Sequence, residues 1–382
     1  MEFEVKTFMT RDYLKVVKFL ASDIFLAKPM KILLLLIFIV QASVQAMTGY
    51  FMATAFNAKF FNNYAPIFFG TFFPLLAISI LLLKNKIFHN LKNELKIWSL
   101  DNAGEKIHSG ITTEIKVVTY FVIVNSVFVL LANSTLAYPL SQDVNVFFGC
   151  YLIHKYILTY GRTFEFFYKA TYLVIGHTNT GHVYQLLYYT QHINYQLQLY
   201  IEFIKFLDEG KTISKNEDDL FNNPTYQTLI NQRLTFLIKR GQEIVKFHIK
   251  KTNEIRTLIP AFSVCTCTMG IGVVFFIISD NFIREYYFRM GMVSLVTVST
   301  FAAGIWSGQS METNLNEITT ALNEVKWYNF NKSNRKLYLI FLTTSMRERK
   351  IKITENYSLN YQLGLTIVRG IYSVISVIIN MK

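Results

Sequence analysis

The chain has 382 residues, of which 52% are hydrophobic and only 16% are charged, and its mean hydropathy is +0.29. Soluble domains carry about 25% charged residues, so a soluble surface cannot be covered with so few. Three cysteines cannot form a disulfide framework, which excludes a small secreted scaffold. The net charge of +13 could indicate nucleic-acid binding, but the basic residues follow a membrane pattern instead. The composition therefore predicts an all-α integral membrane protein that binds no nucleic acid.

Long stretches without a charged residue predict the membrane spans, because a spanning helix needs about 20 apolar residues. Five stretches contain no Asp, Glu, Lys or Arg, namely 32–54, 60–83, 117–138, 257–279 and 290–310. Two weaker stretches are 144–176, which carries four charged residues, and 358–381, which carries Arg369. Together they predict seven transmembrane helices.

The distribution of Lys and Arg predicts the orientation, because cytosolic loops carry an excess of both. The segment before the first span holds six Lys and Arg residues, and the segments after the second, fourth and sixth spans hold six, ten and eight, which makes thirty on one side. The opposite side holds four. This bias predicts a cytosolic N-terminus and an extracellular C-terminus. The chain then divides into a cytosolic N-terminal segment (1–31), spans one to four (32–176) and a cytosolic helical connection (177–256). Spans five and six (257–310), cytosolic anchor helices (311–357) and the last span (358–382) follow.

The long connections on the cytosolic side read largely as helix. Residues 183–207 are periodic, 209–219 form a polar loop, and 231–256 are amphipathic. After the sixth span an apolar seam recurs at 3-4-3 spacing on one helix face, made by Leu315, Ile318, Leu322 and Val325. Two interpretations stay open here: surface helices that pack on one another, or a cytosolic domain that holds subunits together.

The fourth predicted span is unusual because it carries charges. Arg162 and Glu165 are three residues apart and Glu165 and Lys169 four apart, so one helix face can pair all three. Intramembrane charges generally face an interior or a watery cavity. A self-neutralised face and a role in a vestibule both stay open, and Lys155 has no partner nearby in the sequence.

Catalytic and metal-binding motifs are absent from the sequence. No phosphate-binding loop, nucleophile elbow or zinc-protease motif occurs, so we expect no enzyme, no cofactor and no metal. Cys265 and Cys267 lie within the fifth span, where core thiols are expected. His177 and His182 flank a short polar stretch after the fourth span and are expected to be structural.

About 80 residues at the C-terminal end carry a series of motifs. Gly308 opens the step GQSME, Trp327 and Tyr328 lie in LNEVKWYNF, and the basic RKLYLIFL follows. The last span, SLNYQLGLTIVRGIYSVISVIINMK, carries Arg369 before Tyr372 and Ser373. Together these motifs resemble the signature of the insect odorant receptor family. The aromatic that follows the Tyr-Ser pair in the family is replaced by valine here. The chain resembles a variable, ligand-tuned subunit, because the family's shared co-receptor has a longer second cytosolic connection.

The resemblance implies a ligand-gated, non-selective cation channel. Such receptors are tetramers around a central pore lined by the last helix, and the tuned subunit usually assembles with the co-receptor. Each subunit binds a small volatile odorant within its own bundle, in the outer half of the membrane. The expected location is the plasma membrane of a sensory neuron dendrite, in contact with lipid.

Two sets of residues are candidates for these roles. Ser373, Val377 and Asn380 share one face of the last helix, with an apolar position between two polar ones, as a dewetting gate requires. A face that packs against a neighbouring helix is the alternative. Aromatic and small residues in the outer halves of spans two, three, four and six predict an apolar pocket with few polar anchors; they are Phe69, Phe72, Phe73, Asn125, Phe128, Ala132, Tyr156, Tyr160, Ser294 and Thr297.

Competing functions stay open at this point. One is a gustatory receptor channel of the related family, whose Thr-Tyr-five-apolar-Gln ending fits only loosely here. Another is a seven-helix receptor that signals through a cytosolic partner, with the basic cytosolic face as the docking surface. A transporter is weaker, because neither paired broken helices nor an inverted repeat is visible.

Overall fold

A computed structural model of the chain describes residues 8–9, 12–55, 57–84, 95–157, 159–209, 220–255, 258–278, 286–345 and 358–380, with their side chains except at 58, 255, 259, 273–278 and 378–380. These residues are almost entirely helical, and an isolated bridge joins Phe8 and Trp98. The helices are α1 (Lys15–Lys18), α2 (Ile24–Leu26), α3 (Lys28–Thr54), α4 (Ala58–Lys84), α6 (Glu105–Ala137), α7 (Phe148–Tyr156), α8 (Gly161–Lys205), α9 (Pro224–Ile255), α10 (Leu258–Ile278), α11 (Tyr286–Asn323), α12 (Lys332–Ser345) and α13 (Tyr361–Asn380). Short π or 3-10 turns are η1 (Phe19–Asp23), η2 (Leu100–Asn102), η3 (Asp143–Asn145) and η5 (Trp327–Asn329).

Four of the described helices are long and apolar enough to cross a membrane. They are Lys28–Thr54, Lys59–Leu83, Glu105–Ala137 and Tyr286–Asn323, and they contain the first, second, sixth and nearly all of the third expected span. A shorter apolar segment, Pro260–Gly272, lies in α10, where the fifth span is expected. α13 occupies the place of the seventh. The chain is therefore an all-helical protein with helices suited to a bilayer.

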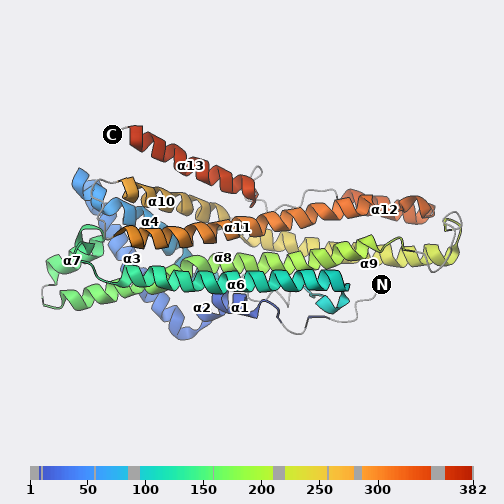
Figure 1. Ribbon diagram of the computed structural model, residues 1–382, viewed down its shortest axis with the longest axis horizontal. Helices are drawn as coiled ribbons and strands as arrows, with labels where there is room; N and C mark the ends of the chain where they lie inside the picture. The colour runs from blue at the N-terminus through green and yellow to red at the C-terminus, as the bar shows by residue number, and fades with distance from the viewer. Residues whose placement is uncertain are drawn as a thin grey trace.

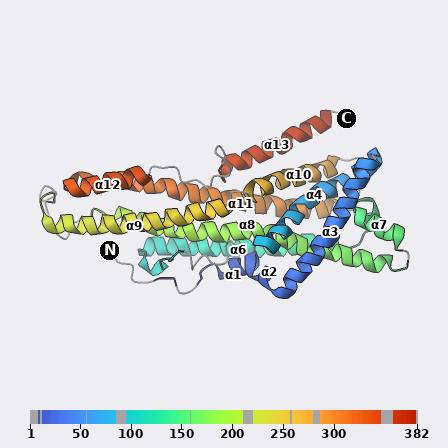
Figure 2. The ribbon, with the colours of Figure 1, turned by 180° about the vertical axis from the view of Figure 1, so that it is seen from behind.

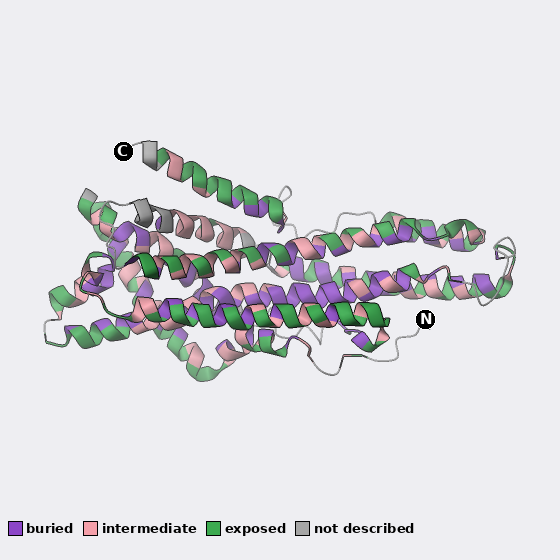
Figure 3. Cartoon of the chain, in the orientation of Figure 1, coloured by how far each residue is buried: buried purple, intermediate pink, exposed green. Residues whose placement is uncertain are grey.

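The longest element, α8, runs through the middle of the molecule. It has 45 residues, which is about 68 Å at 1.5 Å per residue. It packs against α4, α6, α9 and α11, and it follows the long axis in both views (Figures 1 and 2). Buried residues gather along its middle and second half, whereas α13 is exposed over most of its length (Figure 3). α8 is thus the element on which the others are assembled.

The fourth predicted span is not one helix over 144–176, and this prediction is wrong. The chain forms η3 and α7, leaves helical geometry at Ile157 and Tyr160, and begins α8 at Gly161. α7 folds back beside α8. The contact of Gly149 in α7 with Tyr168 in α8 shows this: a β-carbon at Gly149 would be 2.5 Å from the Tyr168 ring. In one continuous helix these two residues would be about 28 Å apart. The reversal follows from packing that the apolar composition of 144–176 does not reveal.

At the opposite end of the long axis lies a bundle of polar helices, here called the distal bundle. It consists of α9, α12 and the C-terminal halves of α8 and α11 (Figure 1). The apolar seam is buried in this bundle within a single chain: Ile318 is 2%, Leu322 0% and Val325 5% exposed, and Leu315 is partly buried. Val325 lies just after the end of α11. α11 also continues through residue 310, so the sixth predicted span and the start of the predicted anchor segment share one helix. The seam therefore stabilises the chain's own core.

The segment before α1 is fastened to α8 through Asp12. Its carboxylate accepts hydrogen bonds from the Tyr188 hydroxyl at 2.7 Å and the Leu14 N–H at 3.0 Å, and it pairs with His192 at 3.2 Å. Burial alone would raise the pKa of Asp12, but the hydrogen bonds and the charge of His192 outweigh it. They hold the pKa of this carboxyl well below its usual value. Through these contacts Asp12 attaches the N-terminal segment to α8.

At the end of the molecule opposite the distal bundle, several helix ends meet at one buried carboxylate, Asp143. It accepts hydrogen bonds from Lys169 of α8, from Tyr286 and Arg289 of α11, and from the Leu140 N–H at 2.7 Å. Asp143 and Lys169 are fully buried, and Arg289 is 4% exposed. The backbone carbonyl of residue 138, after α6, accepts from both cations. The Asp143 cluster therefore joins α6, η3, α8 and α11.

The expected pairing of charges along α8 is wrong in consequence. Lys169 pairs with Asp143, and Glu165 pairs with His154 of α7 at 2.9 Å. Both partners come from the segment that folds back beside α8. Lys155 lies 5.6 Å and 5.4 Å from the ring centroids of Tyr151 and Tyr156, so it does have neighbours.

We predict that Asp143→Asn strongly destabilises the protein. The change leaves Lys169 and Arg289 buried without a counter-charge, and breaking a buried pair in this way costs about 3–5 kcal/mol, a large share of a typical stability of about 5–15 kcal/mol. Thermal melting of the purified protein in detergent measures it. Lys155→Gln, which removes an exposed cation at the same end, is the control and should melt like the wild type. Equal melting of wild type and Asp143→Asn would show that the cluster is dispensable.

Candidate functional site

A cavity of about 330 Å³ lies between five helices. It is bounded by α4, α6, α8, α10 and α11, and the start of α13 closes one side. Its lining is mainly apolar and includes Pro66, Phe73, Pro74, Ala132, Tyr172, Ile175, Phe262, Met269, Val296, Phe301 and Ile367. This size and apolar lining are typical of a site for a small organic molecule.

The α4 wall of the cavity is shaped by two prolines and a close helix contact. Pro66 and Pro74 lie inside α4, and a proline frees the carbonyl one turn before it. α10 approaches this wall at Gly272, where a β-carbon would be 2.8 Å from the Pro66 carbonyl oxygen. A glycine is required at this contact because the neighbouring atom belongs to the backbone. The close approach holds Phe262 of α10 against Phe73, with ring centroids 5.3 Å apart.

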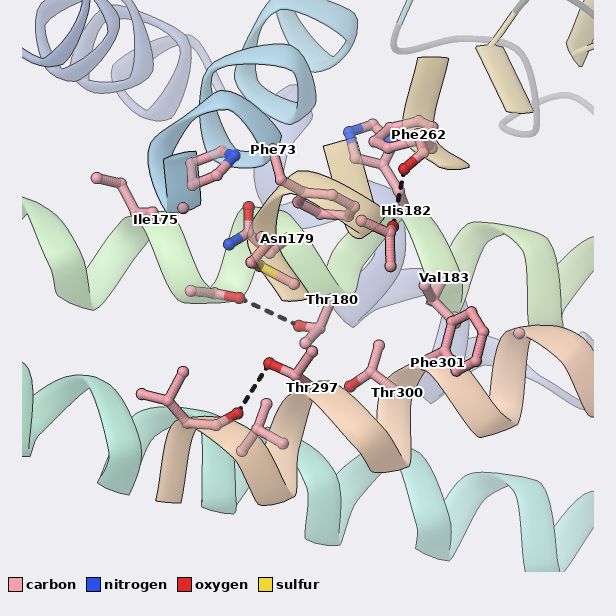
Figure 4. A pocket seen from close by; sticks show the side chains of 18 of the residues that line it. Phe73, Ile175, Asn179, Thr180, His182, Val183, Phe262, Thr297, Thr300 and Phe301 are labelled. Atoms are coloured by element: carbon pink, nitrogen blue, oxygen red, sulfur yellow. Dashed lines mark hydrogen bonds between the residues drawn. The ribbon is translucent and has the colours of Figure 1, made fainter. Parts of the chain in front are cut away.

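Most polar side chains in the lining already have partners in the protein. His182 hydrogen-bonds the Ala77 carbonyl at 2.8 Å, and the hydroxyls of Thr180, Thr266 and Thr297 donate to carbonyls of their own helices. Figure 4 shows Thr180 and Thr297 with these bonds drawn. These groups therefore present mainly their methyl or ring carbons to the cavity.

Two amides in the lining are different. The Nδ2 of Asn133 in α6 and the Oδ1 of Asn179 in α8 are buried and have no hydrogen-bond partner in the described part of the chain. Asn133 lies against Gly176, where a β-carbon would be 1.9 Å from Nδ2. Gly176 and Asn179 are both in the lining and one helical turn apart.

Of the ten residues proposed from the sequence for the pocket, three line the cavity: Phe73, Ala132 and Thr297. Asn125 lies in the core beside it, where its amide donates to Tyr184 at 2.9 Å and Thr300 at 3.0 Å. The other six lie outside the lining: Phe69, Phe72, Phe128, Tyr156, Tyr160 and Ser294.

The reasons for these positions differ. Phe72 and Phe128 are each 38% exposed, because they lie on the faces of α4 and α6 that turn outward. Tyr156 and Tyr160 are 67% and 65% exposed, because the chain reverses between α7 and α8. Sequence reasoning named no pocket residue from α10, because that helix is apolar all round and no face of it could be selected.

The last helix borders the cavity with one face and exposes another. Leu363 and Ile367 are in the lining, whereas Ser373 is exposed and Val377 is 56% exposed. The side chain of Asn380 lies outside the described residues. Ser373 and Val377 thus point away from the bundle of their own chain.

The start of α13 is held tightly by α11. A β-carbon at Gly308 would be 2.2 Å from the Leu359 carbonyl oxygen, so only glycine allows this approach. The Asn360 side chain donates to Glu312 at 3.0 Å, and the N–H at Tyr361 donates to Gln309 at 3.3 Å. Figure 1 shows α13 leaning away from the bundle beyond this attachment.

Among the described residues no group of three or more His, Cys, Asp or Glu side chains is placed to hold a metal ion. His182 lies in the cavity wall and His177 one and a half turns before it in α8. Cys265 and Cys267 are in α10 as free thiols.

Comparison with known proteins shows the fold. No protein-family model matches the chain, and no curated protein matches it in sequence. Among solved structures, the insect olfactory receptor OR5 from Machilis hrabei superposes with a TM-score of 0.69 over 93% of this chain and 90% of that one, at 8% identity. The same receptor in complex with eugenol gives 0.64 over 97% of both chains, also at 8% identity. The chain therefore has the fold of these insect olfactory receptor structures.

Proposed function

We propose that the chain is an odorant receptor subunit of a ligand-gated, non-selective cation channel. The observation that carries the proposal is an apolar cavity whose wall includes Leu363 and Ile367 of α13, the helix expected to line the pore. A ligand in the cavity touches this helix, and a ligand that binds the open arrangement more tightly shifts the channel toward it. The fold shared with olfactory receptors over nearly the whole chain supports this function over an enzyme.

The proposal includes seven spans with the N-terminus in the cytosol. In this arrangement the distal bundle is cytosolic, and the Asp143 cluster, the α3–α4 turn and the end of α13 lie toward the outside. The bias of thirty to four in Lys and Arg supports it. The cellular location in this proposal is the plasma membrane of a sensory neuron.

The proposal also includes a tetramer with a co-receptor subunit around one central pore. Support comes from the exposed face of α13: Tyr372 is 71% and Val377 56% exposed in the single chain. An apolar helix face of this kind needs lipid or other subunits to cover it. Ser373 and Val377 would then face the pore, with Asn380 toward its outer mouth.

We predict that an epitope tag at the C-terminus labels on intact cells and that one at the N-terminus labels only after permeabilisation. The measurement is antibody binding by flow cytometry, with a cytosolic marker as the permeability control. Labelling of the N-terminal tag alone on intact cells would reverse the assignment of every loop.

The proposed function is tested by whole-cell currents. Cells that express the chain with and without an odorant receptor co-receptor receive a panel of volatiles, with a G-protein blocker in the pipette. We expect a cation current that begins on odorant addition and is unaffected by the blocker. A second-messenger response without current, abolished by the blocker, would favour a receptor that signals through a cytosolic partner.

We predict that Val377→Ser raises the current in the absence of odorant. A ring of valines in a narrow pore excludes water, and a hydroxyl in its place wets the constriction. Phe73→Ala, which changes the cavity, serves as the matched variant: it should alter odorant potency and leave basal current and ion permeability unchanged. Normal basal current in Val377→Ser together with altered odorant preference would place Val377 in the pocket.

A further inference from the structure

We propose that the cavity selects apolar molecules that carry one hydroxyl group, that is, alcohols or phenols. The inference rests on the proposed function and names the ligand class of the same cavity. It comes from two amides in the lining, Asn133 and Asn179, each of which has one buried polar atom without a hydrogen-bond partner in the described part of the chain.

Asn133 supplies a hydrogen-bond donor. The residue is 6% exposed, and its Nδ2 has no hydrogen-bond partner among the residues that the structure describes. A buried donor without a partner is unfavourable, so this amide favours an occupant that accepts a hydrogen bond. Gly176 makes room for it, since any side chain there would overlap the amide.

Asn179 supplies a hydrogen-bond acceptor one turn further along α8. Its buried Oδ1 has no partner in the described part of the chain. Figure 4 shows its amide on the α8 wall near Phe73, whereas Thr180, the next residue, turns toward Thr297. Because residues three apart lie on the same helix face, the Asn179 amide and the Asn133 amide seated at Gly176 are neighbours along the wall.

The rest of the wall leaves little choice of polar partner. The nearby hydroxyls of Thr180, Thr266 and Thr297 donate to backbone carbonyls, and His182 pairs with a carbonyl of α4. A hydroxyl both accepts and donates, so a single hydroxyl group offers both the acceptor that Asn133 Nδ2 lacks and the donor that Asn179 Oδ1 lacks. A ketone or ether can accept from Asn133 but leaves the Asn179 oxygen unpaired, and a hydrocarbon satisfies neither.

The experiment compares matched ligands on three carbon skeletons: 1-octanol, 2-octanone and octane; 2-phenylethanol, acetophenone and ethylbenzene; menthol, menthone and menthane. Binding is measured as thermal stabilisation of the purified chain, and gating is measured separately as current. On a skeleton that fits, we expect the alcohol to bind about five- to tenfold more tightly than the ketone, because a hydrogen bond contributes about 1 kcal/mol, and the hydrocarbon to bind more weakly still.

Variants assign the effect to the two amides. Asn179→Leu should abolish the advantage of the alcohol over the ketone and leave ketone binding intact, which also shows that the variant is folded. Asn133→Ala should weaken both. Thr297→Val is the matched control, since its hydroxyl donates to the Val293 carbonyl at 2.8 Å, and its alcohol-to-ketone ratio should equal that of the wild type.

The outcomes separate this inference from the channel function. Alcohols that stabilise the chain without evoking current would support the hydroxyl selectivity of the cavity and overturn the channel function. Ketones or hydrocarbons that bind and gate as well as the alcohols would support the channel function and overturn the hydroxyl selectivity. Failure of every alcohol to bind, or an unchanged alcohol-to-ketone ratio in Asn179→Leu, would also overturn the hydroxyl selectivity.

Discussion

The structure depends on one continuous helix that has to serve two environments. α8 passes from the apolar end, along the cavity and into the distal bundle without a break over 45 residues. A helix satisfies its own backbone hydrogen bonds in lipid and in water alike, so only the side chains must change. The side chains become polar from the end of the cavity onward: Gln185, in the lining, donates to the Ala21 carbonyl at 3.0 Å, and Asn194, further along, donates to Ser310 at 3.1 Å. Gln196 both accepts from the Trp98 N–H at 2.8 Å and donates to its carbonyl at 3.2 Å, and so acts as a backbone partner for that segment.

The chemistry of the cavity follows from how its polar residues are paired. A threonine that donates to its own helix presents a methyl group, so a wall rich in threonine is nearly as apolar as one of valine. Thr180, Thr266 and Thr297 are of this kind. Substitution among threonine, valine and alanine at such positions changes shape more than polarity. The polar character is left to the amides of Asn133 and Asn179, which come from two different helices.

The sequence predicted the helices better than the pocket. Charge-free stretches located α3, α4 and α10 well, because lipid-facing helices must be apolar over their whole length. The stretch 358–381, interrupted only by Arg369, located α13. Composition could not predict the reversal between α7 and α8, since 144–176 is apolar and aromatic on both sides of Gly161. Asp143 was missed for a related reason: its partners, Lys169 and Arg289, are distant in the sequence. For the pocket, the choice between Phe72 and Phe73 depends on how α4 is rotated against its neighbours, which a helix apolar all round does not encode.

The stiffness of α8 has a mechanical consequence. Asn179, in the cavity wall, and Lys205, at the end of the helix, are 26 residues apart, about 39 Å along the axis. A tilt of about 3° at the cavity would move the far end by about 2 Å, more than the clearance in a close-packed core, where gaps are smaller than a water molecule. The distal bundle must then either move with the helix or resist the tilt. α8 would in this way act as a lever that reports the occupancy of the cavity to the opposite end of the molecule.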